Sequence, residues 1–479
     1  MMKNKKIRLF MCIAAAAMLP ALPCAAEGEQ GNMLDIDISG MVVCNGSQIS
    51  YRLEDDQTVS IIGCGSDMTG KVKIPDTIEE KPVTTIAESA FYGVKGLTGV
   101  MIPDSVINIE NGAFYECTAL SDVILPENLR VIGESAFYGC TALTTIDIPD
   151  SVMGISESCF SGCTALENVE FPDSLISIGK SAFYNTKCPK NLKFPADLNT
   201  IEEMAFAYCT NVETVEFSSN IITLGNYVFD GCSALNSIEV DDANASFCDE
   251  NGVLFDKGMT TLLKYPAAKA DKEYTVPIGV TTLANWSFVG AHNLEQIDLS
   301  TVRTFGEETF YQCDSLKSVA IPEDIAELPS AVFAYCESLT NIEIPAHCAK
   351  IGEYAFMNCT GLKSIDVPAT VTEIGDFAIG FAYDEESEAM KQMKGFRIHT
   401  TAGSAAATYA KRSKVKYSTD SKVGLIFLIL LGICAIAGVV AYFVYRKKSE
   451  MHIGAGPNQG QVIRKKKASA KGDTNNEEK

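Results

Sequence analysis

Apolar residues recur along this chain with a fixed period of 23 positions. A fixed period of this size predicts a solenoid, in which each coil buries its apolar face only against its neighbours. A solenoid presents a long exposed surface rather than a closed catalytic pocket, so the pattern favours binding. The period is clearest in one aromatic slot, which continues after an interruption and ends on an isoleucine: Phe91, Phe114, Phe137, Phe160, Phe183, Phe206, Phe229, Phe288, Phe310, Phe333, Phe356 and Ile379.

The other slots of the period predict the path of each coil. Nine and eleven positions after the Phe slot stand apolar pairs such as Ile146 and Ile148. Two apolar slots around one variable slot are typical of a half-buried strand, and Pro149 follows where a strand can end. Another apolar residue, such as Ile132, stands five positions before each Phe. We therefore expect one short parallel strand per coil, then a Pro turn and an irregular or short helical return segment.

Two of these segments resemble a known family. The runs "SAFYGCTALTTIDIPDSVMGI" and "YAFMNCTGLKSIDVPATVTEI" are similar to BspA-type leucine-rich repeats, and the resemblance extends from about Met41 to Tyr417. It implies a leucine-rich-repeat-like, β-rich solenoid and a surface protein that binds other macromolecules. It implies no particular ligand, because a shared fold is weak evidence for a shared function.

The period is interrupted at residues 245–280. Phe229 and Phe288 are 59 positions apart, which is one coil plus 36 residues. The run "GVLFD", the turn "KGMT" and the run "TLLKYP" predict a β-hairpin that stands off the solenoid, and the segment resembles an insertion of the family. We expect a first repeat array at 81–244 and a second at 281–383.

Both ends of the array need caps, because an exposed apolar coil promotes association. Within residues 27–80, the alternating runs "QISYRLED" and "TVSIIGCG" predict a hairpin cap. Residues 384–422 should form a linker and a C-terminal cap, where "FRIHTTAGSAAATYAKRSKVKYS" predicts a strand, a short Ala-rich helix and a strand. The acidic stretch 384–388 is expected to be an exposed loop.

Both termini carry targeting signals. Residues 1–26 have the basic start, apolar centre and small-residue end of a secretory signal peptide; lipid attachment at Cys24 is the less favoured alternative. Residues 423–445 are an uninterrupted apolar stretch long enough to span a bilayer. The basic tail 446–479 follows, which predicts a cytoplasmic C-terminus. We expect a single-pass plasma-membrane protein whose N-terminal domain is displayed on a bacterial cell surface.

The charge is distributed according to this topology. The chain carries a net −22, to which residues 1–26 contribute +4 and residues 446–479 contribute +5, so residues 27–445 carry −31. A domain of this charge repels nucleic acid, which we therefore exclude as a partner.

A row of acidic residues suggests a binding surface. The slot ten positions after each Phe lies between the two buried strand positions, so its side chain should face outward. Like charges on neighbouring strands destabilise a sheet, which suggests that the row binds a cationic partner or divalent cations. The alternative is that outward slots of an acidic chain simply favour soluble residues. The acidic members are Asp147, Glu170, Glu216, Glu239, Asp298, Glu343 and Asp366.

Cysteines occupy a slot of their own, three positions after the Phe. Buried free cysteine is a compact apolar residue, so we interpret this column as structural thiols. Cys44 and Cys64, at the edge of the array, are the better candidates for a disulfide. The eight column members are Cys117, Cys140, Cys163, Cys209, Cys232, Cys313, Cys336 and Cys359.

The sequence contains no recognisable catalytic motif. The histidines lack metal-ligand spacing such as His-Glu-x-x-His, and there is no Gly-x-Ser-x-Gly elbow. We predict no enzyme activity, no metal site and no cofactor.

Two functions are compatible with these observations. The first is a surface protein that captures or adheres to an extracellular protein or glycan. The alternative is a receptor that transmits ligand binding through its short cytoplasmic tail. The tail has no recognisable domain, which favours the first.

Overall fold

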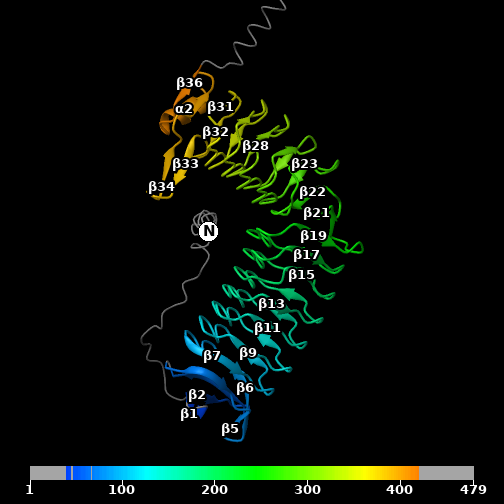
Figure 1. Cartoon of the computed structure of the whole chain (residues 1–479), viewed down its shortest axis with the longest axis vertical. Coiled ribbons are helices and arrows are strands. Elements are labelled where there is room, and N and C mark those ends of the chain that lie inside the picture. The colour runs from blue at the N-terminus through cyan, green and yellow to red at the C-terminus, as the bar shows by residue number, and fades with distance from the viewer. Residues whose placement is uncertain (1–38, 45–46, 66, 420–479) are drawn as a thin grey trace, which may run out of the picture. The chain divides into compact units, whose positions relative to one another are not determined.

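The structure is a computed structural model that describes residues 39–44, 47–65 and 67–419 (Figure 1). The predicted signal peptide, the apolar span 423–445 and the basic tail lie outside the described residues. Within the described ranges, no helix is long and apolar enough to cross a membrane.

Each regular coil contributes a strand at the apolar pair, as the alternation predicts. Most neighbouring strands of this kind pair in parallel with a shift of one period, so that Ile146 lies beside Val169. We call this column the first ladder. Its members are β4 (Thr69–Lys73), β7 (Gly96–Met101), β9 (Asp122–Ile124), β11 (Thr145–Asp147), β13 (Asn168–Glu170), β15 (Asn191–Lys193), β17 (Thr214–Phe217), β19 (Ser237–Val240), β23 (Glu273–Thr275), β25 (Gln296–Asp298), β27 (Ser318–Val319), β29 (Asn341–Ile342) and β31 (Ser364–Asp366).

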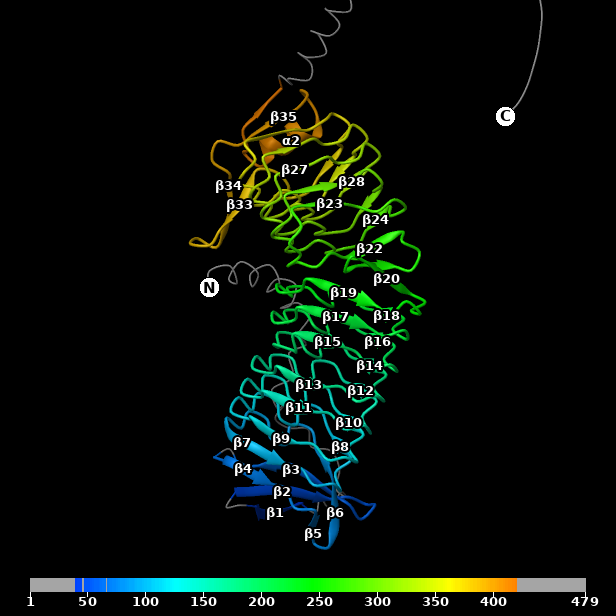
Figure 2. The ribbon, with the colours of Figure 1, turned by 45° about the vertical axis from the view of Figure 1, so that its right-hand side comes forward.

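The prediction of one strand per coil was wrong, because each coil has a second. The residues around the apolar slot before each Phe also pair in parallel, as Ile155 does with Ile178, since the stacked return segments run side by side at ladder spacing. This second ladder adjoins the first (Figure 2). It contains β6 (Lys81–Ile86), β8 (Asn108–Ile109), β10 (Val131–Ile132), β12 (Gly154–Ile155), β14 (Ser177–Ile178), β16 (Thr200–Ile201), β18 (Thr223–Leu224), β22 (Thr261–Lys264), β24 (Thr282–Leu283), β26 (Thr304–Phe305), β28 (Glu327–Leu328), β30 (Lys350–Ile351) and β32 (Glu373–Ile374).

Turns around the Phe slot form a third edge of each coil. Backbone hydrogen bonds join these turns from coil to coil, as from the N–H of Phe137 to the carbonyl of Cys159 at 2.9 Å. The turn requires left-handed backbone two residues before and after the Phe, where Ser135 has φ 55° and Gly139 has φ 68°. The third edge thus adds a row of hydrogen bonds to those of the two ladders.

The phenylalanine slot forms the centre of the core. Phe137 is fully buried, with ring centroids 5.2 Å from Phe114 and 5.5 Å from Phe160 and planes within 7° of parallel. Such offset stacks are favourable beyond the area that they bury. The rings therefore connect successive coils as well as filling them.

The cysteine column reinforces the same contact. The thiol of Cys140 donates to the carbonyl of Phe114 in the preceding coil, with 3.3 Å between sulfur and oxygen, and the other seven column members make the equivalent bond. All eight are free and buried. The interpretation as structural thiols is confirmed.

The predicted disulfide between Cys44 and Cys64 does not agree with the strand order. Strand β2 (Ser47–Leu53) lies between β1 (Ser39–Cys44) and β3 (Val59–Cys64). Two strand spacings separate the backbones of the two cysteines by roughly 10 Å, beyond the Cα range of a disulfide. Cys64 is a free thiol in the structure.

The interruption at 245–280 is more integrated than predicted. Strands β21 (Val253–Asp256) and β22 pair antiparallel, as the hairpin prediction required, and β20 (Phe247–Glu250) adds a further antiparallel strand. The hairpin does not stand off the solenoid, however, because β22 belongs to the second ladder and pairs in parallel with β24. Phe255 and Leu262 are fully buried.

The segment after β21 is a coil of the array. Tyr265 occupies the Phe slot: its ring stacks on Phe288 at 4.9 Å, and its N–H bonds to the carbonyl of Ser287. Tyr274 then follows nine positions later and lies beside Ile297 in the first ladder. The period therefore resumes 23 residues before Phe288, and the insertion is shorter than predicted.

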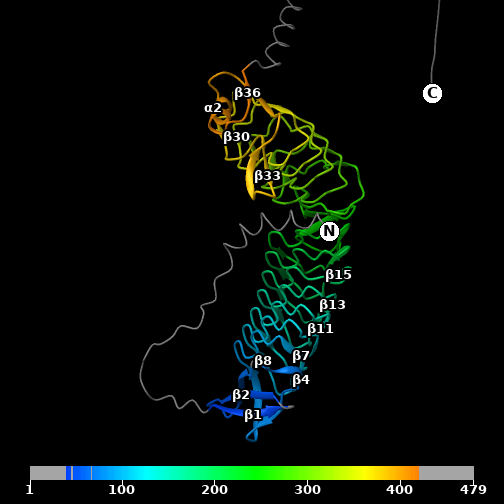
Figure 3. The same ribbon diagram turned by 60° about the vertical axis from the view of Figure 1, so that its left-hand side comes forward.

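The two ends are capped by other elements (Figure 3). β2 pairs antiparallel with β1 and β3, and β5 (Thr77–Ile78) pairs with β6. At the C-terminal end, β35 (Arg397–His399), α2 (Ala405–Arg412) and β36 (Tyr417–Ser418) give the predicted strand, helix and strand. Residues 385–388 of the acidic stretch are the exposed turn between β33 (Phe381–Asp384) and β34 (Ala389–Gln392), and Asp384 is the half-buried last residue of β33.

Replacing Phe137 by Ala should destabilise the fold by about 3–5 kcal/mol, because it removes two ring contacts and leaves a cavity. Tyr92→Ala is the matched control, since that aromatic is 51% exposed. Urea unfolding followed by circular dichroism measures both. Equal losses in the two variants would contradict a central role for the stack.

The eight column thiols should resist modification by N-ethylmaleimide in the native protein, because burial raises the pKa of thiols such as Cys140 and keeps them protonated. Mass spectrometry after labelling with and without urea checks this. Labelling of these sites at the rate of half-buried Cys248 would contradict it.

Candidate binding surfaces

The predicted acidic residues lie on the outer side of the first ladder. Six of the seven are exposed and Glu216 is half-buried, so the prediction that this slot faces outward is confirmed. The row is discontinuous, however. Two acidic pairs lie directly side by side, Asp147 with Glu170 and Glu216 with Glu239.

Lys193 interrupts the row between these pairs. It lies beside Glu216 in the ladder, with its Nζ 3.3 Å from the carboxylate. In the second array, Asp298 lies beside Thr275 and Asp366 beside His399 in the ladder. Glu343 occupies the same slot as Asp366 in the preceding coil. The described residues contain no group of three or more side chains placed to hold a metal ion, so the structure gives no support to the divalent-cation hypothesis.

A shallow open depression follows the acidic part of this face. It runs from Glu170 along Lys193 and Glu216 to Glu239, and Asp173 and Asp241 lie on its border. We call it the acidic depression. Five carboxylates therefore surround a single lysine.

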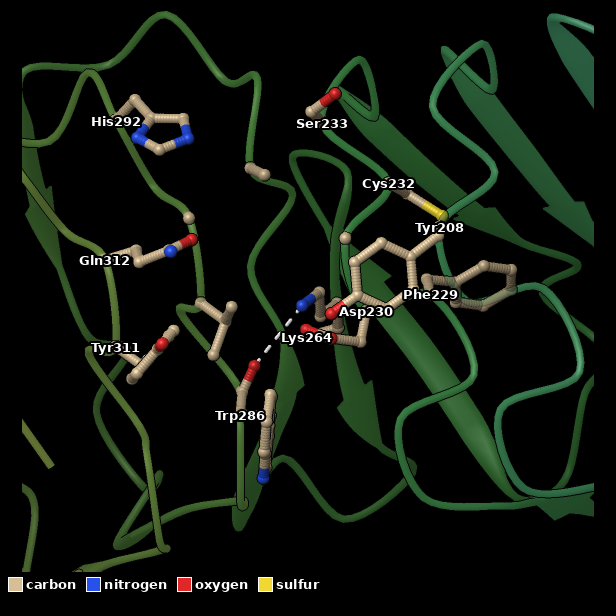
Figure 4. Close-up of a pocket in the computed structure, with 14 residues that line it drawn as sticks. Tyr208, Phe229, Asp230, Cys232, Ser233, Lys264, Trp286, His292, Tyr311 and Gln312 are labelled. Carbon is tan, nitrogen blue, oxygen red and sulfur yellow. Dashed lines mark hydrogen bonds between the residues drawn. The ribbon is translucent and has the colours of Figure 1, made fainter. Parts of the chain in front are cut away.

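A second candidate site lies at the interruption of the array. Along the third edge, a hydrogen bond from the N–H of the Phe slot joins each described coil to the next. It is missing only between the coils of Phe229 and Tyr265. In the ladders, β18 does not pair with β22 and β19 does not pair with β23, although the ladders also break between some regular coils, such as β13 and β15. A cavity opens at this junction between the coils of Phe229 and Tyr265 (Figure 4). We call it the junction cavity.

Two buried charges form the floor of the junction cavity. Asp230 is 2% exposed and Lys264 is 9% exposed. The Tyr208 hydroxyl and the Gly231 N–H bond to the Asp230 carboxylate, but Oδ1 of that carboxylate has no hydrogen-bond partner. A buried polar atom without a partner costs about 1–3 kcal/mol. The Lys264 ammonium donates to the carbonyl of Trp286 at 3.3 Å.

Burial shifts the pKa values of these groups. It raises the pKa of Asp230, which the positive charge of Lys264 partly offsets. It lowers the pKa of Lys264, and here the carboxylate of Asp230 opposes the shift. Nearby Glu308 has its pKa raised to about 8 by burial and by the charge of Asp230. Strongly perturbed groups gathered around one cavity are typical of functional sites.

The walls are aromatic and the mouth is polar. Half-buried Tyr208 and Trp286 lie on opposite sides of the floor, with buried Tyr311 farther along (Figure 4). Ser233, His292 and Gln312 border the mouth. The cavity is small, with a volume of about 40 Å³, and it opens to solvent at its mouth.

The sequence prediction missed the junction cavity because its residues lie in slots of the repeat outside the Phe, strand and Cys columns. The slot two positions after the Phe holds glycine in several coils, such as Gly139 and Gly162, and the turn has positive φ there. Tyr208 takes the same slot with φ 63°. Asp230 follows Phe229 directly, where other coils have Tyr115 or similar residues. These two departures from the repeat pattern were the signal in the sequence that could have indicated the cavity.

Replacing Glu308 by Gln should stabilise the protein at pH 8 and flatten the dependence of its stability on pH. The unfolded carboxyl loses its proton near pH 4.5 whereas the folded one keeps it to about pH 8, so the wild type loses stability as pH rises through this window. Allowing for partial solvent exposure, we expect a gain of about 1–2 kcal/mol at pH 8.

Urea midpoints from pH 4 to 9 measure this effect. Glu307→Gln is the control, because the neighbouring carboxylate is exposed. Parallel profiles for wild type and the Glu308 variant would show that Glu308 titrates normally.

Comparison with known proteins agrees with the repeat architecture. The family model described as "BspA type Leucine rich repeat region" matches in six copies, over residues 69–164, 132–251 and 269–384, which is more than half of the chain. No curated protein matches.

Solved structures share the fold. A leucine-rich cell surface protein from Faecalibacterium prausnitzii A2-165 is similar with 25% identity and a TM-score of 0.58, covering 83% of this chain and all of that one. The pneumococcal vaccine antigen PcpA is similar with 19% identity and a TM-score of 0.55, covering 80% of this chain and 97% of that one. Leucine-rich repeat proteins generally act as binding scaffolds. By its repeats and its fold, the chain belongs to the BspA-type leucine-rich repeat family.

Proposed function

We propose that this protein is a membrane-anchored surface protein that captures a cationic segment of an extracellular protein in the acidic depression. The observation that carries the proposal is the group of carboxylates around Lys193, which includes the in-register pair Glu216 and Glu239. The first ladder holds these side chains on a sheet, where Glu170 and Glu239 are exposed and Glu216 is half-buried.

The physical argument is that the depression is electrostatically unsatisfied. Glu216 and Glu239 lie on adjacent strands about 4.8 Å apart, where like charges repel. Lys193 has one ion pair in the depression, with Glu216. A cationic partner would relieve the remaining repulsion and would also be steered toward this acidic domain.

The sequence and a similar protein support the proposed location. Residues 1–26 carry the pattern of a signal peptide, and 423–445 that of a membrane span. The similar protein from Faecalibacterium prausnitzii is described as a cell surface protein. Together these support display outside the membrane, where extracellular partners are accessible.

Neutralising Glu170, Glu216 and Glu239 together to Gln should weaken binding of a fluorescent decalysine peptide about tenfold. Three exposed ion pairs contribute about 0.2–1 kcal/mol each, and 1.4 kcal/mol corresponds to a factor of ten. Fluorescence anisotropy with the full chain, at low and at physiological ionic strength, measures the affinity and its salt dependence.

The matched control is a variant with Glu134, Glu157 and Glu353 changed to Gln. These three residues share one slot on the return segments, are exposed, and change the net charge by the same amount. An equal loss in both variants would mean that only net charge attracts the peptide. Unchanged binding in the first variant would refute the proposed site.

A further inference from the structure

We propose that the junction cavity is a second binding site, and that it takes a neutral, hydroxyl-rich ligand, namely a sugar residue of a glycan. The inference does not depend on the acidic depression. It follows from the chemistry of the cavity floor, from its walls, and from the way in which the interruption of the array builds it.

The floor requires a group that donates and accepts hydrogen bonds at once. Oδ1 of buried Asp230 needs a donor. The ammonium of Lys264 has three protons, and one of them goes to the Trp286 carbonyl. A hydroxyl group can donate to the carboxylate and accept from the ammonium. A cation would be repelled by Lys264 and an anion by Asp230, so the floor favours a neutral polyol.

The walls and the size agree with a sugar. Tyr208 and Trp286 provide apolar ring surface beside the floor, on which the C–H groups of a sugar ring can pack. The cavity volume of about 40 Å³ holds about three waters, and therefore two or three hydroxyl groups. The ring itself would lie in the open mouth, where His292 and Gln312 offer polar contacts.

The local structure is specific to this junction. Strand β21 and the turn before it replace the missing coil contact, with the N–H of Ile238 bonding to the carbonyl of Gly252. Gly231 makes room for the aromatic wall, because a Cβ there would come within 2.7 Å of the Tyr208 ring. A regular coil would close this space with the next turn of the third edge.

The chain contains a single tryptophan, Trp286, in the wall of the cavity, so fluorescence excited selectively at tryptophan, and not at the 17 tyrosines, reports on the surroundings of this residue. We would titrate the full chain with glucose, galactose, mannose and N-acetylglucosamine. We expect a saturable change with at least one of them, and tighter binding of a glycan that ends in the same sugar. If the free sugar and the glycan bind with equal affinity, the ligand of the junction cavity is the free monosaccharide.

Asp230→Asn should raise the Kd of that sugar about ten- to a hundredfold, because it removes a charged hydrogen-bond acceptor. Gln312→Ala, a change at a half-buried residue of the mouth, should raise the Kd several-fold without affecting the core. Circular dichroism checks that both variants keep the wild-type fold. If the Asp230 variant does not fold, the Kd of the Gln312 variant tests the proposal by itself.

Three results would overturn the proposal: no saturable response to any of the sugars, an unchanged Kd in the mouth variant, or a saturable response to n-butylamine instead. The variant with Glu170, Glu216 and Glu239 changed to Gln separates the two sites. It should keep the sugar response while losing the decalysine peptide, whereas Asp230→Asn should do the reverse. Failure of one proposal would therefore leave the other intact.

Discussion

Stacking of each coil on the next is the interaction on which the rest of this structure depends. A single coil cannot bury its phenylalanine, so Phe137 is removed from water only because Phe114 and Phe160 lie on either side of it. The thiol of Cys140 ties the same two coils together through the carbonyl of Phe114. Because every contact joins nearest neighbours, the exposed slots can vary with little effect on the fold.

The junction between Phe229 and Tyr265 shows what happens when this stacking is interrupted. Strands β20 and β21 restore apolar burial there, since Leu254 belongs to the core of the first array and Phe255 to that of the second. They do not restore the backbone bond of the third edge. The remaining space contains Asp230 and Lys264, whose burial is unfavourable unless they are paired or bound. An interruption that weakens the rod thereby creates its most chemically distinctive cavity.

The sequence predicted the coils well and the junction poorly. The 23-residue spacing of Phe, Cys and the strand pairs was sufficient for the first ladder, the core and the two caps, because each slot has the same neighbours in every coil. It failed for the second ladder, since a single apolar residue such as Ile155 carries no alternation. It also failed at Tyr265, where a tyrosine in the Phe slot and a shortened return segment concealed a coil within an apparent insertion.

The sequence by itself determined the solenoid, the outward direction of the acidic slot and the structural role of the cysteines. These properties follow from local periodicity, because side chains at a fixed spacing along a strand or a turn have fixed directions. Only the tertiary structure decided which acidic residues are neighbours, that Cys44 and Cys64 are separated by a strand, and that Tyr208, Asp230, Lys264 and Trp286 surround one cavity. Those facts depend on how distant coils meet across an irregular junction, and no repeat in the sequence encodes that contact.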